Sequence, residues 1–399
     1  THPVTVDLAG VAITINTLSG DDVINAVEKG ETLVVSGSTS GVEAGQTVTV
    51  TFGGKNYTTT VESNGSWTVN VPPADLAALP DGAGNVQASV SNINGNSAQA
   101  DRAYSVDATA PLVTINTIAS DDILNAAEAG SALTISGTST AEAGQTVTVT
   151  LNGVNYSGNV QADGSWSVSV PTGDLANLTA SPYTVSAAVS DKAGNPASAT
   201  HNLTVDLAAP VVTINTVAGD DIINATEHAQ AQIISGSATG ATTGNTVSVT
   251  IGTTTYTTVL DANGNWSIGV PASVISALAQ GDVTITATVT DSAGNSGTAS
   301  HTVTVALGAP VLAINTIAVD DIINATEKGA DLAISGSSNQ PAGTQITVTL
   351  NGQNYTTTAD ASGNWSVTVP ASRVSALGEA TYTVTAAATD SDGNSGSAS

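Results

Sequence analysis

A fixed internal period of about 100 residues constrains the fold of this chain more than any other feature of its sequence. Each period contains one tryptophan that follows a short turn sequence such as NGS or SGN, and these tryptophans are Trp67, Trp166, Trp266 and Trp365. Self-similarity at a fixed interval is the signature of tandem structural units. The sequence therefore predicts four copies of one domain joined end to end.

Alternation of apolar and polar residues predicts β-strands within each copy. In the second copy, Val147, Val149 and Leu151 alternate with threonines, the period of two that half-buried strands show. Strands are expected at residues 112–118, 132–137, 145–151, around Tyr156, around Trp166, 183–189 and 199–205, with one helical turn at 173–178. Such a series of short strands is typical of an immunoglobulin-like β-sandwich. We expect an all-β chain whose four tandem immunoglobulin-like sandwiches form an elongated rod.

The aligned copies also predict the domain boundaries. The four repeats are expected at residues 8–107, 108–206, 207–306 and 307–399. Residues 1–7 resemble the final strand and linker of a preceding repeat, because His2 aligns with His201 at the start of a matching segment. The fourth repeat is expected to lack its own final strand. These two observations predict that the chain is cut from a longer array.

The charge balance excludes several classes of partner. The chain has 33 acidic residues against 6 Lys and Arg, a net charge of −27, which disfavours nucleic acid and anionic membranes. Divalent cations are the natural counterions. There is no cysteine, so any metal site must use oxygen or imidazole ligands. No apolar run reaches the length of a membrane helix, and the first residues lack the pattern of a signal peptide, so export would be encoded outside this segment.

Three acidic segments recur from copy to copy. The first follows the first strand and contains an Asp-Asp pair, an asparagine and a glutamate, as in Asp21, Asp22, Asn25 and Glu28. The second is a linker aspartate. The third is the loop before the last strand, with the pattern Asp-x-x-Gly-Asn.

Immunoglobulin topology brings these segments together at the junctions between repeats, because the loop after the first strand and the loop before the last strand lie at opposite ends of a sandwich. The predicted set at the first junction is Asp21, Asp22, Glu28, Asp107, Asp191 and Asn195. The set at the second is Asp121, Asp122, Glu128, Asp206, Asp291 and Asn295. The set at the third is Asp220, Asp221, Glu227, Asp390 and Asn394, with Ala306 in place of the linker aspartate.

These oxygen-rich sets predict calcium, which accepts about six to eight oxygen ligands in flexible geometry. A second interpretation needs no metal. An Asp-Asp pair is often a solvated loop, Asn-Ala-x-Glu can shape a helical turn, and Asp-x-x-Gly-Asn is ordinary turn chemistry.

Other candidate sites have simpler explanations. His2, His201 and His301 share one strand position and His228 lies in a loop, so we expect no histidine cluster. The aligned tryptophans and tyrosines could form a sugar-stacking platform, but their phase with apolar neighbours favours packing in the core. No motif for a catalytic nucleophile is present, and the chain is expected not to be an enzyme.

The repeated pattern VDxxAP, VTINT, GDDIINATE, GQTVTVTLNG, NGNWSVTVP and DSAGNSG resembles the bacterial immunoglobulin-like repeats of giant adhesins, the BapA-type biofilm-associated proteins secreted by a type I system. The resemblance implies a calcium-loaded stalk at the bacterial surface that supports cell adhesion and biofilm formation. Its expected partners are neighbouring repeats, like fibres, and host or abiotic surfaces. The first copy and the third junction depart from the pattern, at residues 91–96 and at Ala306.

Two other functions remain open at this stage. The repeats could themselves bind glycans or matching fibres through their loops, although those loops are short and lack aromatic residues. They could also be accessory domains of a secreted hydrolase.

Overall fold

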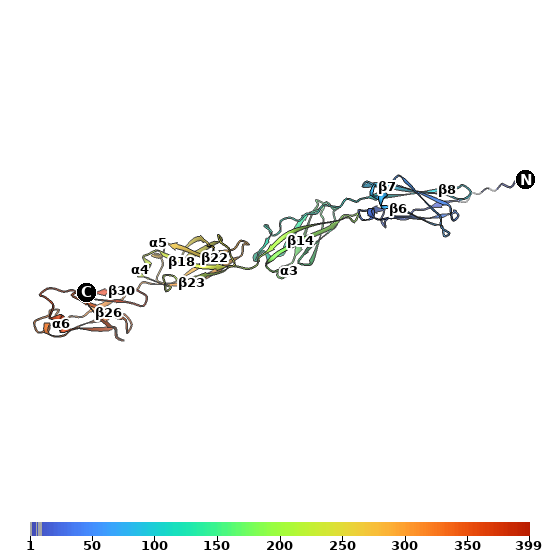
Figure 1. Ribbon diagram of the computed structural model, residues 1–399. Helices are drawn as coiled ribbons and strands as arrows, with labels where there is room; N and C mark the ends of the chain where they lie inside the picture. Colours follow the sequence, from blue (N-terminus) through green and yellow to red (C-terminus); the bar gives the residue numbers. More distant parts are fainter. Residues whose placement is uncertain (1, 5, 7–9) are drawn as a thin grey trace. The chain divides into compact units, whose positions relative to one another are not determined.

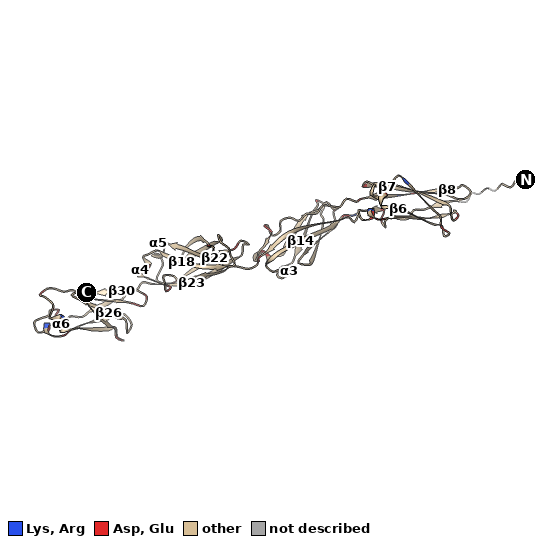
Figure 2. Ribbon diagram, viewed as in Figure 1, with Lys and Arg blue, Asp and Glu red and all other residues tan. Residues whose placement is uncertain are grey.

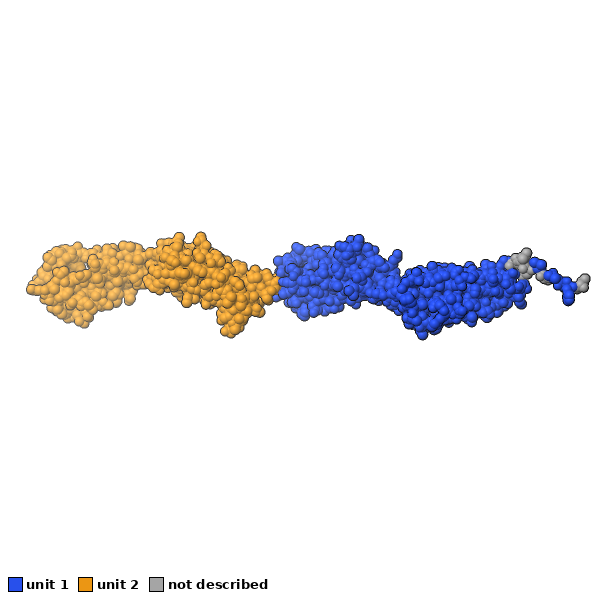
Figure 3. All heavy atoms as spheres, turned by 90° about the horizontal axis from the view of Figure 1, so that it is seen from above, with its two compact units in different colours: residues 1–207 blue, residues 208–399 orange. Residues whose placement is uncertain are grey.

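The computed structural model describes residues 2–4, 6 and 10–399. They form two compact units, Thr1–Leu207 and Ala208–Ser399 (Figure 3). Each unit contains two of the predicted repeats, and every repeat has its own hydrophobic core. The all-β prediction is confirmed, since strands make up almost all of the regular structure (Figure 1). The repeat limits themselves stay a prediction.

Repeat 1 is a sandwich of two sheets. The smaller sheet contains β1 (Ala12–Ile13), β3 (Leu33–Ser40) and β6 (Ser66–Val71). The larger contains, in spatial order, β2 (Val23–Ile24), β8 (Ser97–Val106), β7 (Gly82–Ser91), β4 (Thr47–Phe52) and β5 (Lys55–Thr60). Two short helical turns are η1 (Glu28–Gly30) and α1 (Pro73–Ala77).

Repeat 2 has the same arrangement. Its smaller sheet contains β10 (Leu133–Thr138) and β13 (Ser165–Val170), which pair antiparallel. The strand predicted at residues 112–118 is reduced to an isolated bridge between Val113 and Ser139. Its larger sheet contains β9 (Ile123–Leu124), β15 (Pro196–Val205), β14 (Ser181–Ser190), β11 (Thr146–Leu151) and β12 (Val154–Asn159). The helices are α2 (Ala126–Ala129) and α3 (Thr172–Leu175).

Repeat 3 completes the same plan in the second unit. Its smaller sheet contains β16 (Val211–Ile214), β18 (Gln232–Thr239) and β21 (Asn265–Val270). Its larger sheet contains β17 (Ile222–Asn224), β23 (Ser296–Ala306), β22 (Gly281–Thr290), β19 (Thr246–Ile251) and β20 (Thr254–Val259). The helices are α4 (Ala225–His228) and α5 (Ala272–Ile275).

Repeat 4 differs in its larger sheet. The smaller sheet contains β24 (Leu312–Ile314), β25 (Leu332–Ser338) and β28 (Asn364–Val369). The larger contains only β27 (Gln353–Thr358), β26 (Gln345–Leu350), β29 (Val384–Thr389) and a short β30 (Ser395–Ala398). The turns are η2 (Glu327–Gly329) and α6 (Ala371–Val374). β30 corresponds to the first four residues of β15, and the expectation that this repeat lacks the rest of its last strand stays a prediction.

The short strand that follows the acidic loop in repeats 1, 2 and 3 was not predicted. β2, β9 and β17 each pair in parallel with the last strand of their own repeat. In repeat 2, Ile123 and Leu124 align with Thr204 and Val205. A strand of two residues has no periodicity of its own, and its existence depends on a partner some 80 positions away in the sequence.

The tryptophans lie in the cores, as the sequence predicted. Trp67, Trp166, Trp266 and Trp365 are at most 3% exposed. A glycine of the facing strand permits this position. A Cβ on Gly137 would lie 2.6 Å from the Trp166 ring and 1.9 Å from the carbonyl oxygen of Thr114. Only glycine at position 137 leaves room for both the backbone of Thr114 and the ring of Trp166.

The predicted strand at residues 2–6 lies partly outside the described residues. Residues 2–4 and 6 have no regular secondary structure, and Val4 and Val6 are 85% and 73% exposed. Residues 5 and 7, including the linker aspartate Asp7, are not among the described ones.

Candidate functional site

The junction between repeats 1 and 2 is organised by one buried asparagine. Asn195, in the loop before β15, is 1% exposed. Its Oδ1 accepts a hydrogen bond of 2.8 Å from the backbone N–H of Ala26 in repeat 1. Its Nδ2 donates to the backbone oxygen of Asp107 in the linker and to Oδ2 of Asp191, both at 2.9 Å. One side chain thus connects both repeats and the linker.

The partner in repeat 1 is the turn after β2. The Oδ1 of Asn25 accepts from the N–H of Glu28 at 3.1 Å, and Glu28 Oε2 accepts from the N–H of Asn25 at 3.0 Å. Asn25 Nδ2 also donates to the carbonyl oxygen of Ala193 across the junction at 3.1 Å. Asn125 with Glu128 and Asn224 with Glu227 make the same reciprocal contacts at α2 and α4. The helical-turn interpretation of Asn-Ala-x-Glu is therefore confirmed.

The junction between repeats 3 and 4 repeats the central part of this contact. Asn394 is 2% exposed, and its Oδ1 accepts from the N–H of Ala225 at 2.7 Å. Its Nδ2 donates to Asp390 Oδ2 at 3.2 Å. The linker residue here is Ala306, which has no side-chain oxygen. Both described junctions therefore share the asparagine contact, and they differ in the linker carboxylate.

The predicted set of the second junction is divided between the two units. In the first unit, the backbone N–H of Asp206 donates to the carbonyl oxygen of Leu124 at 3.0 Å. In the second unit, Asp291 Oδ1 accepts from the N–H of Asn295 at 2.8 Å. The grouping of these residues at one site stays a prediction.

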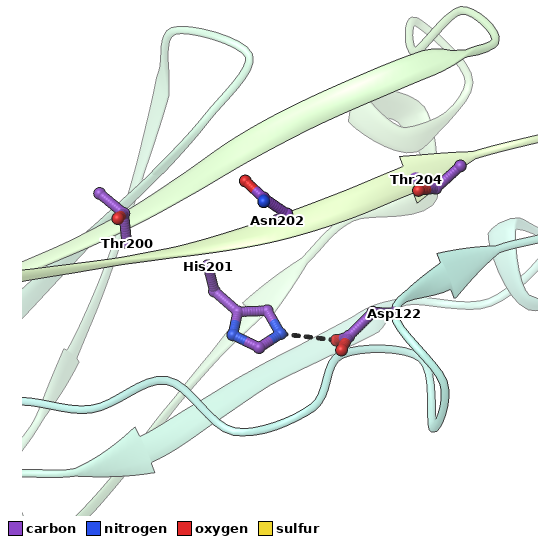
Figure 4. Close-up of a pocket in the computed structure, with 5 residues that line it drawn as sticks. All are labelled: Asp122, Thr200, His201, Asn202 and Thr204. Atoms are coloured by element: carbon purple, nitrogen blue, oxygen red, sulfur yellow. Dashed lines mark hydrogen bonds and ion pairs between the residues drawn. The ribbon is translucent and has the colours of Figure 1, made fainter.

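In repeats 1, 2 and 3, the second aspartate of the acidic pair is bound to a basic side chain of its own repeat. Arg102 on β8 donates to both carboxylate oxygens of Asp22 at 2.6 Å. His201 on β15 points toward Asp122, with 2.7 Å between its Nε2 and the Asp122 Oδ1 (Figure 4). His301 and Asp221 make the same contact at 2.7 Å. Asp22, Asp122 and Asp221 could bind a metal only by giving up these partners.

The sequence interpretation did not identify these basic partners of the aspartates. A signal was present, because Arg102, His201 and His301 occupy equivalent strand positions. The hydrogen bonds from Arg102 hold the pKa of Asp22 below its usual range. The pKa of Asp122 is also lowered, first by the N–H of Ile118 and then by His201.

The first aspartate of each pair shapes the start of the following strand. Asp21, Asp121 and Asp220 each accept a backbone hydrogen bond of 3.0 Å from the residue two positions later. The second aspartates have positive φ angles, 65° at Asp22 and 66° at Asp122, a conformation that aspartate tolerates better than most residues. Much of the Asp-Asp pattern is thus explained by local loop structure.

Two carboxylates in the loops that precede the last strands of repeats 2 and 3 are nearly buried. Asp191 and Asp291 are each 8% exposed. Asp191 accepts hydrogen bonds from Asn195, and neither aspartate forms an ion pair with Lys, Arg or His within the described residues. Burying a carboxylate without a compensating cation is costly.

The junction residues fit a calcium ion in part. At the first junction, Glu28, Asp107, Asp191 and Asn195 are linked by hydrogen bonds through the Asn25 turn, and their donor atoms are oxygens, which calcium prefers. In the part of the chain that the structure describes, however, no three His, Cys, Asp or Glu side chains converge closely enough to hold a metal ion. Figure 2 shows the acidic residues mainly in loops.

No sugar platform is formed by the tryptophans, because their rings are buried. Within the described residues, no helix is long and apolar enough to cross a membrane.

Comparison with known proteins gives a consistent result. Residues 117–207 and 212–306 match the family described as bacterial Ig-like domain. A Ca2+-stabilized adhesin that helps an Antarctic bacterium bind ice is 38% identical, over 98% of this chain and 97% of that chain, with a TM-score of 0.43. A 1.5-MDa bacterial ice-binding adhesin is 37% identical, over 75% of this chain and 98% of that chain, with a TM-score of 0.41. A tetra-tandem repeat from the extending region of a large adhesion protein is 26% identical, over 97% and 98%, with a TM-score of 0.38. No curated protein matches the chain.

Proposed function

Because this chain belongs to the bacterial Ig-like domain family, we propose that it is an extender segment of a large bacterial adhesin, with junctions stabilised by calcium. Its task is to hold an adhesive region away from the cell. A segment of this kind needs stable repeats and defined junctions, and it needs no catalytic site.

The observation that carries the proposal is the recurrence of one junction contact. In both units an asparagine from the loop before the last strand accepts a hydrogen bond from the first turn of the preceding repeat, as in Asn195 with Ala26 and Asn394 with Ala225. Each of these asparagines is nearly buried. This shared asparagine contact therefore joins neighbouring repeats within each unit.

Calcium is supported by charge and by chemistry. The chain carries a net charge of −27, and Asp191 is buried at a junction without a cationic partner among the described residues. A cation bound by Glu28, Asp107 and Asp191 would compensate for this burial and attach the linker to both repeats. The adhesin that is 38% identical is itself described as Ca2+-stabilized. The full predicted sets, including the aspartates bound to Arg102, His201 and His301, stay part of the proposal.

The wider setting follows from the resemblance to large adhesins. We place the chain outside the cell, at the bacterial surface, after type I secretion, in a role that supports adhesion and biofilm formation. Its immediate partners are the neighbouring repeats of the same protein, and like fibres or host and abiotic surfaces are the targets of the whole adhesin. Direct glycan binding by these repeats has no supporting feature, since the tryptophans that could stack on sugars are buried.

Isothermal titration of calcium into the metal-free chain tests the proposal. We expect binding with dissociation constants of about 0.1 to 1 mM, the range of extracellular calcium modules. Asp191→Asn should remove or weaken at least tenfold one class of sites. The matched control is Asp163→Asn in the same repeat, since Asp163 lies in an exposed hairpin turn and bonds only to Ser165 in the described contacts. The calcium proposal is wrong if the chain binds no calcium at several millimolar, or if both variants bind it like the parent chain.

A further inference from the structure

One side chain of the last strand closes the acidic loop of repeat 1. Arg102 on β8 donates to both carboxylate oxygens of Asp22 at 2.6 Å. It also donates to the carbonyl oxygen of Ile15 at 3.1 Å and to the hydroxyl oxygen of Thr17 at 2.9 Å. Asp22 Oδ1 in turn accepts from the N–H of Leu18 at 2.9 Å. Arg102 therefore contacts both the beginning and the end of the loop at residues 15–22.

Backbone hydrogen bonds continue this contact from the loop toward the junction with repeat 2. The N–H of Ser105 donates to the carbonyl oxygen of Asp22 at 2.9 Å. The N–H of Asp107 donates to the carbonyl oxygen of Ile24 at 3.0 Å, and the Ile24 side chain is fully buried. Asn25, where the junction turn begins, directly follows Ile24. The chain between Asp22 and the turn is therefore held along the last strand of its own repeat.

The turn that follows provides the donor of the junction contact. The N–H of Ala26 donates to Asn195 Oδ1 at 2.8 Å, and Asn195 is itself bound to Asp191. A hydrogen bond weakens steeply when the donor points away from its acceptor. Because Asn195 is nearly buried, the loss of this bond would leave a polar group without a partner. The junction therefore requires one orientation of the Ala26 N–H, and this orientation depends on where repeat 1 holds residues 22–24.

The second unit combines the same two contacts. In repeat 3, His301 on β23 lies 2.7 Å from Asp221, measured from Nε2 to Oδ1. The N–H of Thr304 donates to the carbonyl oxygen of Asp221 at 2.9 Å. Farther along, the N–H of Ala225 donates to Asn394 of repeat 4 at 2.7 Å. An arginine in one unit and a histidine in the other thus bind the loop that leads to the same junction bond.

We infer that Arg102 and His301 are positioning residues of the junctions: each ties the acidic loop to the last strand and thereby directs the following turn toward the next repeat. His201, which points toward Asp122 in the same way (Figure 4), has this role for the turn at residues 125–128. The inference rests on the proposed role of the junctions and needs no bound calcium. The simpler alternative is that the basic residue stabilises only its own loop, in which case its loss would leave the junction bond intact.

Amide hydrogen exchange of the full chain, followed by NMR in the presence of a calcium chelator, separates the two explanations. Arg102→Ala should accelerate exchange of the Ala26 N–H about tenfold. The side-chain amide resonances of Asn195, in the next repeat, should shift as well. Arg102→His should restore both readouts, because histidine can donate to a carboxylate and His201 and His301 contact their aspartates from the equivalent position.

Asp101→Ala is the matched control, because Asp101 neighbours Arg102 on β8 and bonds to side chains of β7 instead. It should leave exchange at Ala26 unchanged. If Arg102→Ala does not fold, His301→Ala decides the question in the second unit, where exchange of the Ala225 N–H should rise in the same way. The chelator separates this test from the calcium titration, so either proposal can fail without the other.

Two outcomes would overturn the inference. In the first, Arg102→Ala accelerates exchange at Leu18, inside the acidic loop, and leaves Ala26 as protected as in the parent chain. In the second, exchange at Val50 in the core strand β4 rises as much as at Ala26, because general destabilisation of repeat 1 would then explain the loss of protection.

Discussion

Repeats 3 and 4 differ mainly in one strand, and the difference shows what this strand contributes. In repeat 3, β23 runs from Ser296 to Ala306, while β30 of repeat 4 has only four residues. Val217 and Ile223 of repeat 3 are at most 1% exposed. Their counterparts Ile317 and Ile323 are only partly buried. The second half of the last strand therefore covers the loop side of the core.

The same comparison separates local from distant causes in the acidic loop. Asp321 keeps a positive φ of 63° and accepts from the N–H of Ile317 at 2.8 Å, as Asp221 does from Val217. The short strand β17 has no counterpart in repeat 4, because the strand with which it pairs is missing at this point. The local sequence therefore determines the conformation of the loop at its second aspartate. Pairing with the distant last strand determines whether the residues after the loop join the sheet.

The largest expected loss of stability follows from replacing the tryptophans, which are equally buried in repeats 3 and 4. Trp266→Ala and Trp365→Ala should each destabilise their repeat by about 3 to 5 kcal/mol, since both rings are buried. Chemical denaturation of each variant measures the loss. A loss below about 1 kcal/mol would show an exposed ring.

Substitution of each tryptophan by phenylalanine serves as the control, because it keeps a buried aromatic ring and removes the Nε1–H group. Trp365 Nε1 donates to the carbonyl oxygen of Ser337 at 3.1 Å, while the buried Nε1 of Trp266 has no partner among the described residues. Trp266→Phe should therefore cost less than Trp365→Phe, because it loses no hydrogen bond.

The second prediction concerns the glycines beneath these rings. A Cβ on Gly236 would lie 2.0 Å from the carbonyl oxygen of Thr213, and one on Gly336 would lie 1.9 Å from that of Ala313. Gly236→Ala and Gly336→Ala should each cost about 3 kcal/mol, because backbone must move to admit the methyl group. Gly269→Ala is the control, since a Cβ there meets nothing within 4 Å. Equal stability of Gly236→Ala and Gly269→Ala in thermal denaturation would contradict the packing.

The third prediction tests the missing strand directly. Amide hydrogen exchange at residues 380–383 should be at least tenfold faster than at residues 281–284, a difference of about 1.4 kcal/mol in local opening. In repeat 3 these residues pair with β23, and in repeat 4 they have no such partner in the described structure. Equal protection in the two segments would show that the last strand does not stabilise this edge.

The smallest expected effect is the loss of stability at low pH that follows from the lowered pKa of Asp221. Burial raises the pKa of Asp221, but hydrogen bonds from His301 and from the N–H of Val217 outweigh it and leave the pKa below the usual value. A lowered carboxyl pKa contributes stability at pH above about 4, and this contribution is lost as the pH falls further. Carbon-detected NMR titration in calcium-free buffer should show that His301→Ala raises the pKa of Asp221. His228→Ala is the control, because His228 bonds to Leu278 instead. If the pKa of Asp221 is the same in His301→Ala as in the parent chain, then His301 does not lower it.

Sequence reasoning predicted the strands with clear periodicity and the tryptophans of the core. The helical turn expected at residues 173–178 is present as α3 (Thr172–Leu175). The contact of Arg102 with Asp22 was not predicted, because the two residues are 80 positions apart and an Asp-Asp pair also fits a metal ligand. The junction asparagines were predicted as metal ligands. In the structure Asn195 and Asn394 accept backbone hydrogen bonds, a role that residue type alone does not distinguish from ligation, and their role as metal ligands stays a prediction.

Small-angle scattering with and without calcium measures whether calcium stabilises the junctions between the repeats. Domains joined by short linkers move relative to each other unless their interface holds them. Chelation of calcium should decrease the maximum dimension of the chain and broaden its distance distribution, and added calcium should restore both. Ala306→Asp, which supplies the linker carboxylate that the third junction lacks, should lower the calcium concentration needed for half of this change. A chelated chain with the same scattering curve as the calcium-loaded chain would contradict the claim.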